Sequence, residues 1–292
     1  MAFLAQTTIT RPIEIAGAGL HTGAAARVVL GPAAAGRGIN FRRNGREIPA
    51  VLAAVVNTHF NTAVGDDEAR VSTIEHLMAA LALAGIDNIS IEVDGPELPA
   101  LDGSAAPWLE ALGEAGPRDL AAPREVLHIM ERVSVTDDHG RSISAEPFDG
   151  RVVDVSINFP DAAIGAQRVK LDLDDAADVR RVALARTFCR RDEIDRLRAK
   201  GLSLGGTLDN AVVVDGAHVL NPSGLRDPQE FALHKALDLI GDLRLAGAPL
   251  IGRIVADRPG HDLNARFLAA LLADSRAVMR GPEAARGLRA SA

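Results

Sequence analysis

Short runs in which hydrophobic and polar residues alternate mark the first part of the chain. The runs Thr8–Thr10, Ile13–Ile15 and Ala26–Leu30 have the period of two that is typical of strands with one buried face. The run Ile89–Val93 has the same pattern. Residues 31–50 lie between these runs and are rich in Gly, Pro and Asn, so they predict loops.

Two segments of the first half have helical spacing instead. In Thr73–Ala84, apolar residues recur every three or four positions from Ile74 to Leu81, and Gly85 then supplies a residue that ends helices. A shorter helix is expected at Ala106–Glu114. In the first half, three predicted strands therefore precede the first helix, and a fourth lies between the two helices.

A stretch with two prolines and no periodicity, Gly116–Arg124, predicts a boundary between domains of residues 1–119 and 120–292. Strands followed by helices in both halves predict an α+β fold. The elements expected in the second half are strands at Glu125–Val135, Ser142–Ala145 and Val152–Phe159, a strand–helix–strand piece over residues 182–215 with its helix at Ile194–Ala199, a helix at Pro228–Ala246, a strand at Ile251–Ala256 and a helix at Asp262–Leu272.

Composition narrows the class of protein. Hydrophobic residues make up 47% and charged residues 24%, which fits a globular chain and excludes wholesale disorder. The net charge of −7 argues against a nucleic-acid partner. The single cysteine, Cys189, excludes a disulfide framework or a Cys-rich zinc module within the chain.

The membrane is expected to be at most a peripheral contact. The most apolar run, Leu77–Ile86, has ten residues, whereas a spanning helix needs roughly 20. The start, Met1–Gln6, lacks the basic and long apolar regions of a signal peptide. A cytoplasmic chain is therefore expected. A monomer is expected as well.

The segment His234-Lys235-x-x-Asp238 lies on the longest predicted helix. His234 and Asp238 are four residues apart, so they share one helix face, and Asp242 lies a further turn along it. A neutral imidazole and a carboxylate at this spacing can bind one divalent cation. The alternative is an ordinary ion pair on a solvated helix face.

Two further segments contain histidine beside possible acid–base groups. Glu75 and His76 could supply a base and a ligand, but Ser72-x-x-Glu75 also matches a capping box, and His76 could be a core histidine. His261 follows a Pro-Gly turn, where it could act in acid–base chemistry or simply begin a surface helix. His21 lies in the segment Gly17–Gly23, which is predicted to be a bend between two strands.

Taken together, these segments resemble the zinc-dependent deacetylases that act on UDP-3-O-acyl-N-acetylglucosamine in lipid A synthesis. Each motif alone is weak, but their occurrence in this order over residues 17–264 is specific. The matching stretches are residues 19–23, Ser72-Thr73-Ile74-Glu75-His76-Leu77, residues 85–88, Leu101-Asp102-Gly103-Ser104-Ala105-Ala106-Pro107, residues 185–188, 205–211, 220–221 and 224–226, His234-Lys235-x-x-Asp238-x-x-Gly241-Asp242 and Gly260-His261-x-Leu263-Asn264.

The resemblance implies one Zn²⁺ per chain held by His76, His234 and Asp238, with Fe²⁺ as an alternative ion. Two histidines and one carboxylate leave a fourth position open, as in catalytic zinc sites. Because the ligands come from both halves, the resemblance places the metal between two similar domains. Each domain would be a sheet layered on two helices, with the helices sandwiched between the sheets.

The resemblance also implies the catalytic residues. Glu75 would be the general base, His261 the general acid for the leaving amine, and Asp242 its carboxylate partner. Thr187 and Lys235 would stabilise the charge that develops on the amide oxygen. Together these roles imply a hydrolase that removes the N-acetyl group and releases acetate.

For the substrate, the resemblance implies that Phe159 contacts the uridine and that Arg258 meets the diphosphate, where the family usually has Lys. Phe188 and His21 also belong to matching motifs. The insert at residues 182–215 would form a passage for the acyl chain. The chain departs from the family after Phe188, where Cys189-Arg190 stands in place of the common Gly-Phe.

Two other classes of protein remain as alternatives. A zinc-bearing relative could bind a nucleotide-sugar lipid without turnover, although a complete base and acid set argues against this. A metal-free α+β binding protein would use His234 and Asp238 only as an ion pair.

Overall fold

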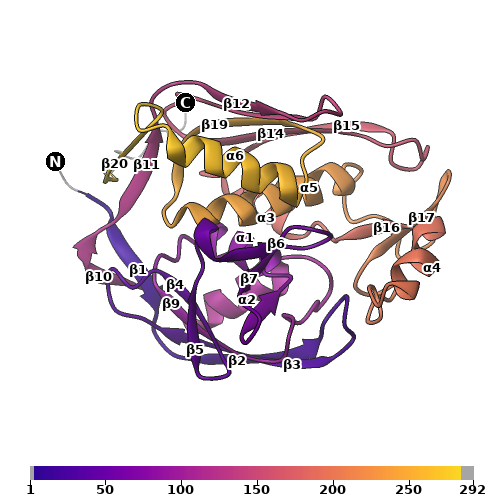
Figure 1. Ribbon diagram of the computed structural model, residues 1–292, viewed down its shortest axis with the longest axis horizontal. Helices are drawn as coiled ribbons and strands as arrows, with labels where there is room; N and C mark the ends of the chain where they lie inside the picture. Colours follow the sequence, from indigo (N-terminus) through magenta and orange to yellow (C-terminus); the bar gives the residue numbers. More distant parts are fainter. Residues whose placement is uncertain (1–2, 284–292) are drawn as a thin grey trace.

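The computed structural model of the protein describes residues 3–283. Most of its helices lie between an upper and a lower group of strands, and the helix at residues 191–199 lies at the right edge (Figure 1). Five sheets and six α-helices in these residues are compatible with the predicted α+β class. The outer limits of the two predicted domains, residues 1–2 and 284–292, lie outside the described residues.

The lower sheet has the order β2-β3-β9-β4-β5. Its members are β2 (Ile13–Ala18), β3 (Ala25–Pro32), β4 (Ile39–Arg43), β5 (Arg46–Pro49) and β9 (Ile89–Asp94). The central strand β9 buries Ile89, Ile91 and Val93 on one face, as its alternation predicts. The sheet therefore has one apolar face, which is packed into the core.

The prediction of loops for residues 31–50 is wrong, because β4 and β5 form a hairpin there. Asn44 and Gly45 have positive φ values of 51° and 75°, which is the conformation of a type I′ turn. Asn-Gly between two short apolar runs is the strongest local hairpin signal. The many surrounding Gly and Pro residues obscured it, although Phe41 is fully buried.

The upper sheet is built around β19, which pairs with β11, β13 and β14. The sheet comprises β11 (Glu125–Ile129), β12 (Val133–Thr136), β13 (Ser142–Glu146), β14 (Arg151–Asn158), β15 (Ala166–Asp172), β19 (Leu250–Asp257) and β20 (Val278–Pro282). The single strand predicted at Glu125–Val135 is thus two strands, and β15 was not predicted.

Three small sheets complete the strands. They are β1 (Ala5–Ile9) with β10 (Pro117–Pro123); β6 (Val55–Asn57), β7 (Ala63–Gly65) and β8 (Arg70–Ser72); and β16 (Phe188–Arg190), β17 (Val212–Asp215) and β18 (His218–Val219). The segment predicted as an irregular boundary is therefore mostly the strand β10. Its partner is the first strand of the chain.

The α-helices are α1 (Glu75–Leu83), α2 (Ala106–Ala115), α3 (Ala176–Ala183), α4 (Arg191–Ala199), α5 (Glu230–Leu243) and α6 (His261–Ala273), with short 3₁₀ helices at Leu52–Ala54 and Arg244–Ala246. Helix α3 was not predicted, and it contains Val182, where the insert was expected to begin with a strand. In residues 3–283, no helix combines the length and apolar character needed to cross a membrane.

Helix α5 is the central element of the structure. Every residue of α5 except Lys235 is buried, and the helix contacts α1, α3, α6 and β14. Helix α1 from the first half approaches α5 closely at Gly241, where an added Cβ would overlap the backbone carbonyl oxygen of Glu75. This close contact sets the distance between the two helices that carry the candidate ligands.

We expect Gly241→Ala to lower the free energy of unfolding by about 1–3 kcal/mol, because a methyl group would have to displace the backbone of α1. Urea denaturation measures this change. Gly113→Ala on α2 is the matched control, since nothing lies within 4 Å of an added Cβ there. That control should be neutral or stabilise the protein by about 0.5–1 kcal/mol. Equal stability of the two variants would contradict the close helix contact.

Candidate metal centre and active site

The three predicted metal ligands come together at the contact between α1 and α5. His76 lies on α1, and His234 and Asp238 lie on α5. Their ligand atoms all lie within 4.8 Å of one another. Asp238 Oδ1 is 3.3 Å from His234 Nε2 and 3.8 Å from His76 Nε2. All three residues are buried, so the alternative of an ion pair on a solvated helix face is wrong.

Neighbouring groups orient these ligand atoms. His234 Nδ1 lies 3.2 Å from the Ala185 carbonyl oxygen, which only accepts, so Nδ1 carries the proton and Nε2 keeps its lone pair. Lys235 Nζ lies 2.7 Å from Asp238 Oδ2, which leaves Oδ1 facing the histidines. The next residue after Ala185, Arg186, forms a buried ion pair with Glu230 at 2.8 Å that holds this backbone in place.

The pKa values in this cluster favour the protonation states that a divalent cation requires. Burial lowers the pKa of His234 to about 3 and also lowers that of His76, against the opposing charge of Asp238. Burial raises the pKa of Asp238, but His234 and Lys235 outweigh it and hold that pKa below its usual range. Two neutral imidazoles and one carboxylate therefore face a common point, as metal binding requires.

Glu75 does not act as a capping residue. Ser72 lies in β8, the residue at the N-cap of α1 is Ile74, and no side chain caps the helix. Instead, the Thr62 backbone N–H donates to Glu75 Oε2 at 3.0 Å. Burial raises the pKa of Glu75 to about 8, helped by Asp242 and Asp238 and opposed by His261. A buried carboxyl group with this pKa suits proton transfer near neutral pH.

His261 and Asp242 form a second pair beside Glu75. His261 Nδ1 lies 2.8 Å from Asp242 Oδ2. Asp242 also accepts from Thr62 Oγ1 at 2.6 Å and from Asn264 Nδ2 at 2.8 Å, so its carboxylate is fixed on both oxygens. Burial lowers the pKa of His261, but Asp242 more than offsets it and raises it to about 9. Its imidazole ring is therefore protonated at neutral pH.

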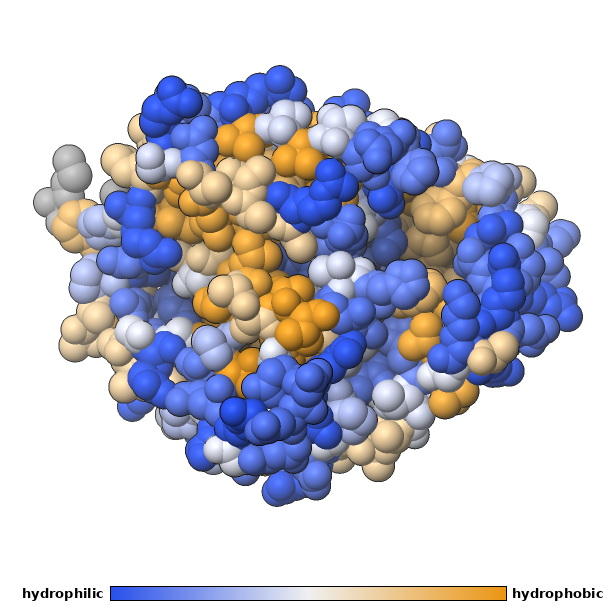
Figure 2. Space-filling view, viewed as in Figure 1, coloured by the Kyte–Doolittle hydropathy of each residue, from blue (hydrophilic) through white to orange (hydrophobic). Residues whose placement is uncertain are grey.

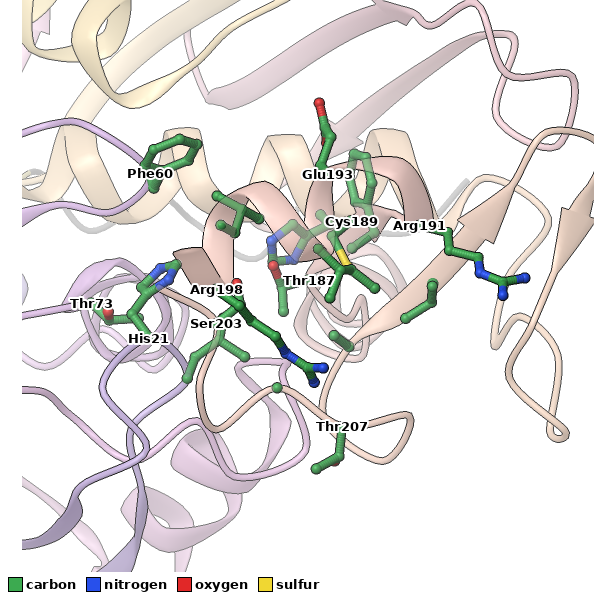
Figure 3. Close-up of a pocket in the computed structure, with 18 of the residues that line it drawn as sticks. His21, Phe60, Thr73, Thr187, Cys189, Arg191, Glu193, Arg198, Ser203 and Thr207 are labelled. Carbon is green, nitrogen blue, oxygen red and sulfur yellow. The ribbon is translucent and has the colours of Figure 1, made fainter. Parts of the chain in front are cut away.

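A cavity of about 840 Å³ opens beside these groups. Its inner lining includes all three candidate ligands together with Glu75, His261, Lys235, Thr187, Phe188 and His21. Its outer part is lined by the insert, which contributes Cys189, Arg191, Glu193, Arg198, Ser203 and Thr207, and Arg198 lies beside Ser203 (Figure 3). The insert's outer surface is mostly hydrophilic (Figure 2).

Similarity to known proteins covers nearly the whole chain. The profile of the family described as LpxC, UDP-3-O-acyl N-acetylglycosamine deacetylase, matches residues 6–273. This chain belongs to that deacetylase family. Relatives named UDP-3-O-acyl-N-acetylglucosamine deacetylase include one from Anaeromyxobacter sp. (strain Fw109-5), 45% identical over 94% of this chain and 90% of the relative. Another, from Phenylobacterium zucineum, is 46% identical over 92% and 93%, and that of Myxococcus xanthus is 42% identical over 92% and 87%.

Two residues predicted to contact the substrate in this deacetylase chain do not line the cavity. The Phe159 ring packs against Phe188, with ring centroids 5.5 Å apart, and Phe188 itself lines the cavity. Arg258 Nε lies 3.0 Å from Asp257, and the same guanidinium donates to the Gly140 carbonyl oxygen at 3.0 Å. Phe159 therefore reaches the cavity only through Phe188, and Arg258 is held outside the cavity lining by Asp257 and Gly140.

Cys189 and His21 line the cavity with no acid–base partner of their own. Burial raises the pKa of Cys189 to about 11, so its thiol stays protonated, as expected of a structural cysteine. His21 is buried, and its Nδ1 has no hydrogen-bond partner among the described residues. Burial lowers the pKa of His21 against the opposing charge of Glu97, so its ring is neutral.

Sequence reasoning missed three groups that hold this site together. Thr62 joins Glu75 to Asp242, Asn264 holds Asp242, and Glu97 is a buried carboxylate behind the cavity wall. Asn264 belongs to a motif that the resemblance used, so that motif could have suggested it. Thr62 and Glu97 lie in segments with no charge pattern or periodicity, and only tertiary contacts reveal them.

Proposed function

We propose that this chain is a zinc-dependent deacetylase that hydrolyses the N-acetyl group of UDP-3-O-(3-hydroxyacyl)-N-acetylglucosamine and releases acetate during lipid A biosynthesis. Family membership supports the substrate and the reaction. The observation that carries the mechanism is one cavity wall bearing two histidines and a carboxylate next to a carboxyl group and a protonated histidine.

The ligand set proposed for the metal is His76, His234 and Asp238. Two imidazoles and one carboxylate suit Zn²⁺, with Fe²⁺ as the other candidate, and leave room for water and substrate. When bound, zinc supplies Lewis acidity, which polarises an amide carbonyl and brings the pKa of a water molecule toward ~7. The side chains of this chain carry out the proton transfers and hold the charge that develops on the amide oxygen.

In this proposal Glu75 takes the proton of the attacking water. The Thr62 N–H occupies Oε2, so Oε1 is the oxygen left for the proton. His261 then gives its proton to the leaving amine from Nε2, because Nδ1 faces Asp242. Asp242 holds the ring in this orientation and keeps it protonated until the transfer.

Lys235 and Thr187 are the proposed partners of the charge that develops on the amide oxygen. Both line the cavity, and the Lys235 ammonium group lies 5.6 Å from the centre of the Phe188 ring. In other enzymes one such donor contributes about 3–4 kcal/mol to the transition state. Lys235 would also keep Asp238 charged when the substrate is absent.

The substrate is proposed to lie along the cavity, with its acyl chain between the insert and the body. Phe188 and His21 would contact the sugar and the start of the acyl chain, because both line the cavity. Phe159 and Arg258 would contact the uridine and the diphosphate beyond it. We also propose that the halves 1–119 and 120–292 are two similar domains whose helices are sandwiched between their sheets, and that the enzyme is a cytoplasmic monomer.

A deacetylation assay on the UDP-linked acyl-glucosamine, with and without a chelator, tests this function. We expect acetate release that the chelator abolishes and added zinc restores. A protein that binds zinc and the substrate but releases no acetate would be a binding protein instead. A purified protein with neither stoichiometric zinc nor stoichiometric iron would contradict the metal site.

The pH dependence of turnover should have a basic limb near pH 9. The pKa of His261 is raised to about 9, so the ring carries the proton it must donate below that pH and loses it above. Because Asp242 is what raises this pKa, Asp242→Asn should move the basic limb down by about 1–3 units. Kinetics over pH 6–10, of order ten pH points per variant, measure this.

Asp262→Asn is the matched control for this experiment, because Asp262 is exposed in the first turn of α6, the helix that begins with His261. Its basic limb should stay close to that of the unmodified enzyme. A limb that does not move in Asp242→Asn would remove His261 from the role of acid.

A further inference from the structure

Glu97 is a buried carboxylate that lies outside the reacting groups. Its side chain is 1% exposed, and it follows β9 in an irregular segment that runs beside β8. Among the described residues, no Lys or Arg forms an ion pair with it. A buried carboxylate without a cation must be stabilised by hydrogen bonds, so its donors show what it holds in place.

Four donors from two segments surround the Glu97 carboxylate. Oε1 accepts from the His21 N–H at 2.9 Å and from Thr73 Oγ1 at 2.8 Å. Oε2 accepts from the Thr22 N–H at 2.8 Å and from Thr22 Oγ1 at 2.7 Å. Each oxygen thus receives one backbone N–H and one hydroxyl. An added Cβ at Gly19 would overlap Oε2, so the turn of residues 19–23 closes directly onto the carboxylate.

The turn held by Glu97 carries one wall of the cavity. The Leu204 N–H donates to the His21 carbonyl oxygen at 3.0 Å, and the Gly205 N–H donates to that of Leu20 at 3.1 Å. An added Cβ at Gly205 would overlap the Gly19 carbonyl oxygen. Leu20 and His21 therefore line the cavity in contact with the part of the insert that includes Ser203, and Figure 3 shows His21 and Ser203 on the same side of it.

On its other side, Glu97 holds the turn before α1. Thr73 has a φ of 57°, an unfavourable conformation for a β-branched residue, and its hydroxyl group donates to Oε1. Along the chain, only Ile74 lies between Thr73 and the pair Glu75-His76. The same carboxylate therefore connects the cavity wall at Leu20 and His21 with the helix end that carries the proposed base and ligand.

We propose that Glu97 is a positioning residue that sets the acyl-chain selectivity of the enzyme by holding the turn of residues 19–23 against the insert. This inference rests on the proposed function, because it assumes that the acyl chain occupies the outer part of the cavity. The carboxylate touches neither the substrate nor the metal ligands. It acts by fixing the position of a wall that runs from His21 to the insert at Ser203, so that a long acyl chain packs against more of this wall than a short one does.

Glu97→Gln tests this with almost no change in volume. The two backbone N–H groups point at different oxygens, so either orientation of the amide places its NH₂ group against one of them. The turn must then shift. We expect kcat/KM for a long 3-O-acyl substrate to fall about tenfold relative to that for a short one, through KM, which is the effect of about one lost hydrogen bond in a buried site.

Thr22→Val is the second variant, since it removes one donor without burying an unmatched amide. It should shift the same ratio in the same direction by a smaller factor. Thr22→Ser keeps the hydroxyl group and should behave as the unmodified enzyme. Melting temperature and zinc content of each variant report whether it is folded and loaded.

The ratio of dissociation constants for the long and short substrates, measured calorimetrically on metal-free protein, gives a readout independent of turnover. A shifted ratio supports the inference even if the unmodified protein binds without hydrolysis, in which case only the proposed function fails. An unchanged ratio in a folded Glu97→Gln variant, or an equal loss for both substrates, overturns the inference while leaving the deacetylase function intact. If neither the long nor the short substrate binds to the unmodified protein, both the inference about Glu97 and the proposed function are overturned.

Discussion

Glu75→Gln should lower kcat by about 10²–10⁴-fold while the enzyme keeps one zinc per chain. The amide has the size of the carboxyl group and can still accept from the Thr62 N–H, but it cannot take a proton from water. None of the three candidate ligands is altered. Because the pKa of Glu75 is about 8, the metal-free protein already holds this group uncharged at neutral pH, so the neutral amide should not impair folding. Steady-state kinetics and metal analysis measure both outcomes.

Glu110→Gln is the matched control, because Glu110 is an exposed glutamate on α2. It should retain full activity and full zinc content. If Glu75→Gln also retained full activity, the proton of the attacking water would have to go elsewhere, and Glu75 would have only a structural role beside Thr62. A variant that lost its zinc would instead assign Glu75 to the metal site.

His234→Ala should abolish metal binding, and turnover should fall by at least about 10³-fold. The substitution removes a ligand whose orientation is fixed by Ala185 and leaves two ligands for an ion that needs at least three. Metal analysis after dialysis and a deacetylation assay measure the two losses. Chelated unmodified enzyme should be equally inactive, but added zinc should restore only the unmodified enzyme.

His139→Ala controls for the loss of an imidazole, since His139 is exposed in the turn between β12 and β13. It should bind zinc and turn over substrate normally. Stoichiometric zinc in a folded His234→Ala variant would show that the ion lies elsewhere, and the cluster of His76, His234 and Asp238 would then be only a buried polar network.

Sequence periodicity predicted several helices and strands in which apolar residues recur at regular intervals. The helices α1, α2 and α6 and the strands β3, β9 and β19 lie within a few residues of their predicted positions. The misses have particular causes. The β4–β5 hairpin was hidden by surrounding glycines. Helix α3 has only eight residues, of which three are charged, and Val182 and Ala183 are its only buried residues.

For the candidate site, spacing alone left two interpretations of almost every residue. The difference between a metal ligand and a surface ion pair is burial, and an interval of four residues carries no information about burial. The resemblance chose between them for His76, His234 and Asp238, and the structure places these residues together. Thr62 and Glu97 could not be predicted, because their partners are distant in the sequence and each hydrogen bond depends on the complete fold.

The order of the site residues along the chain has a consequence for synthesis. Glu75 and His76 leave the ribosome well before His234 and Asp238, which lie 158 and 162 positions after His76. At roughly 5–20 residues per second, the first ligand waits on the order of ten seconds or more for its partners. A nascent chain that ends before α5 therefore has one candidate ligand and no site. The proposed metal site can therefore form only after α5 has been synthesised.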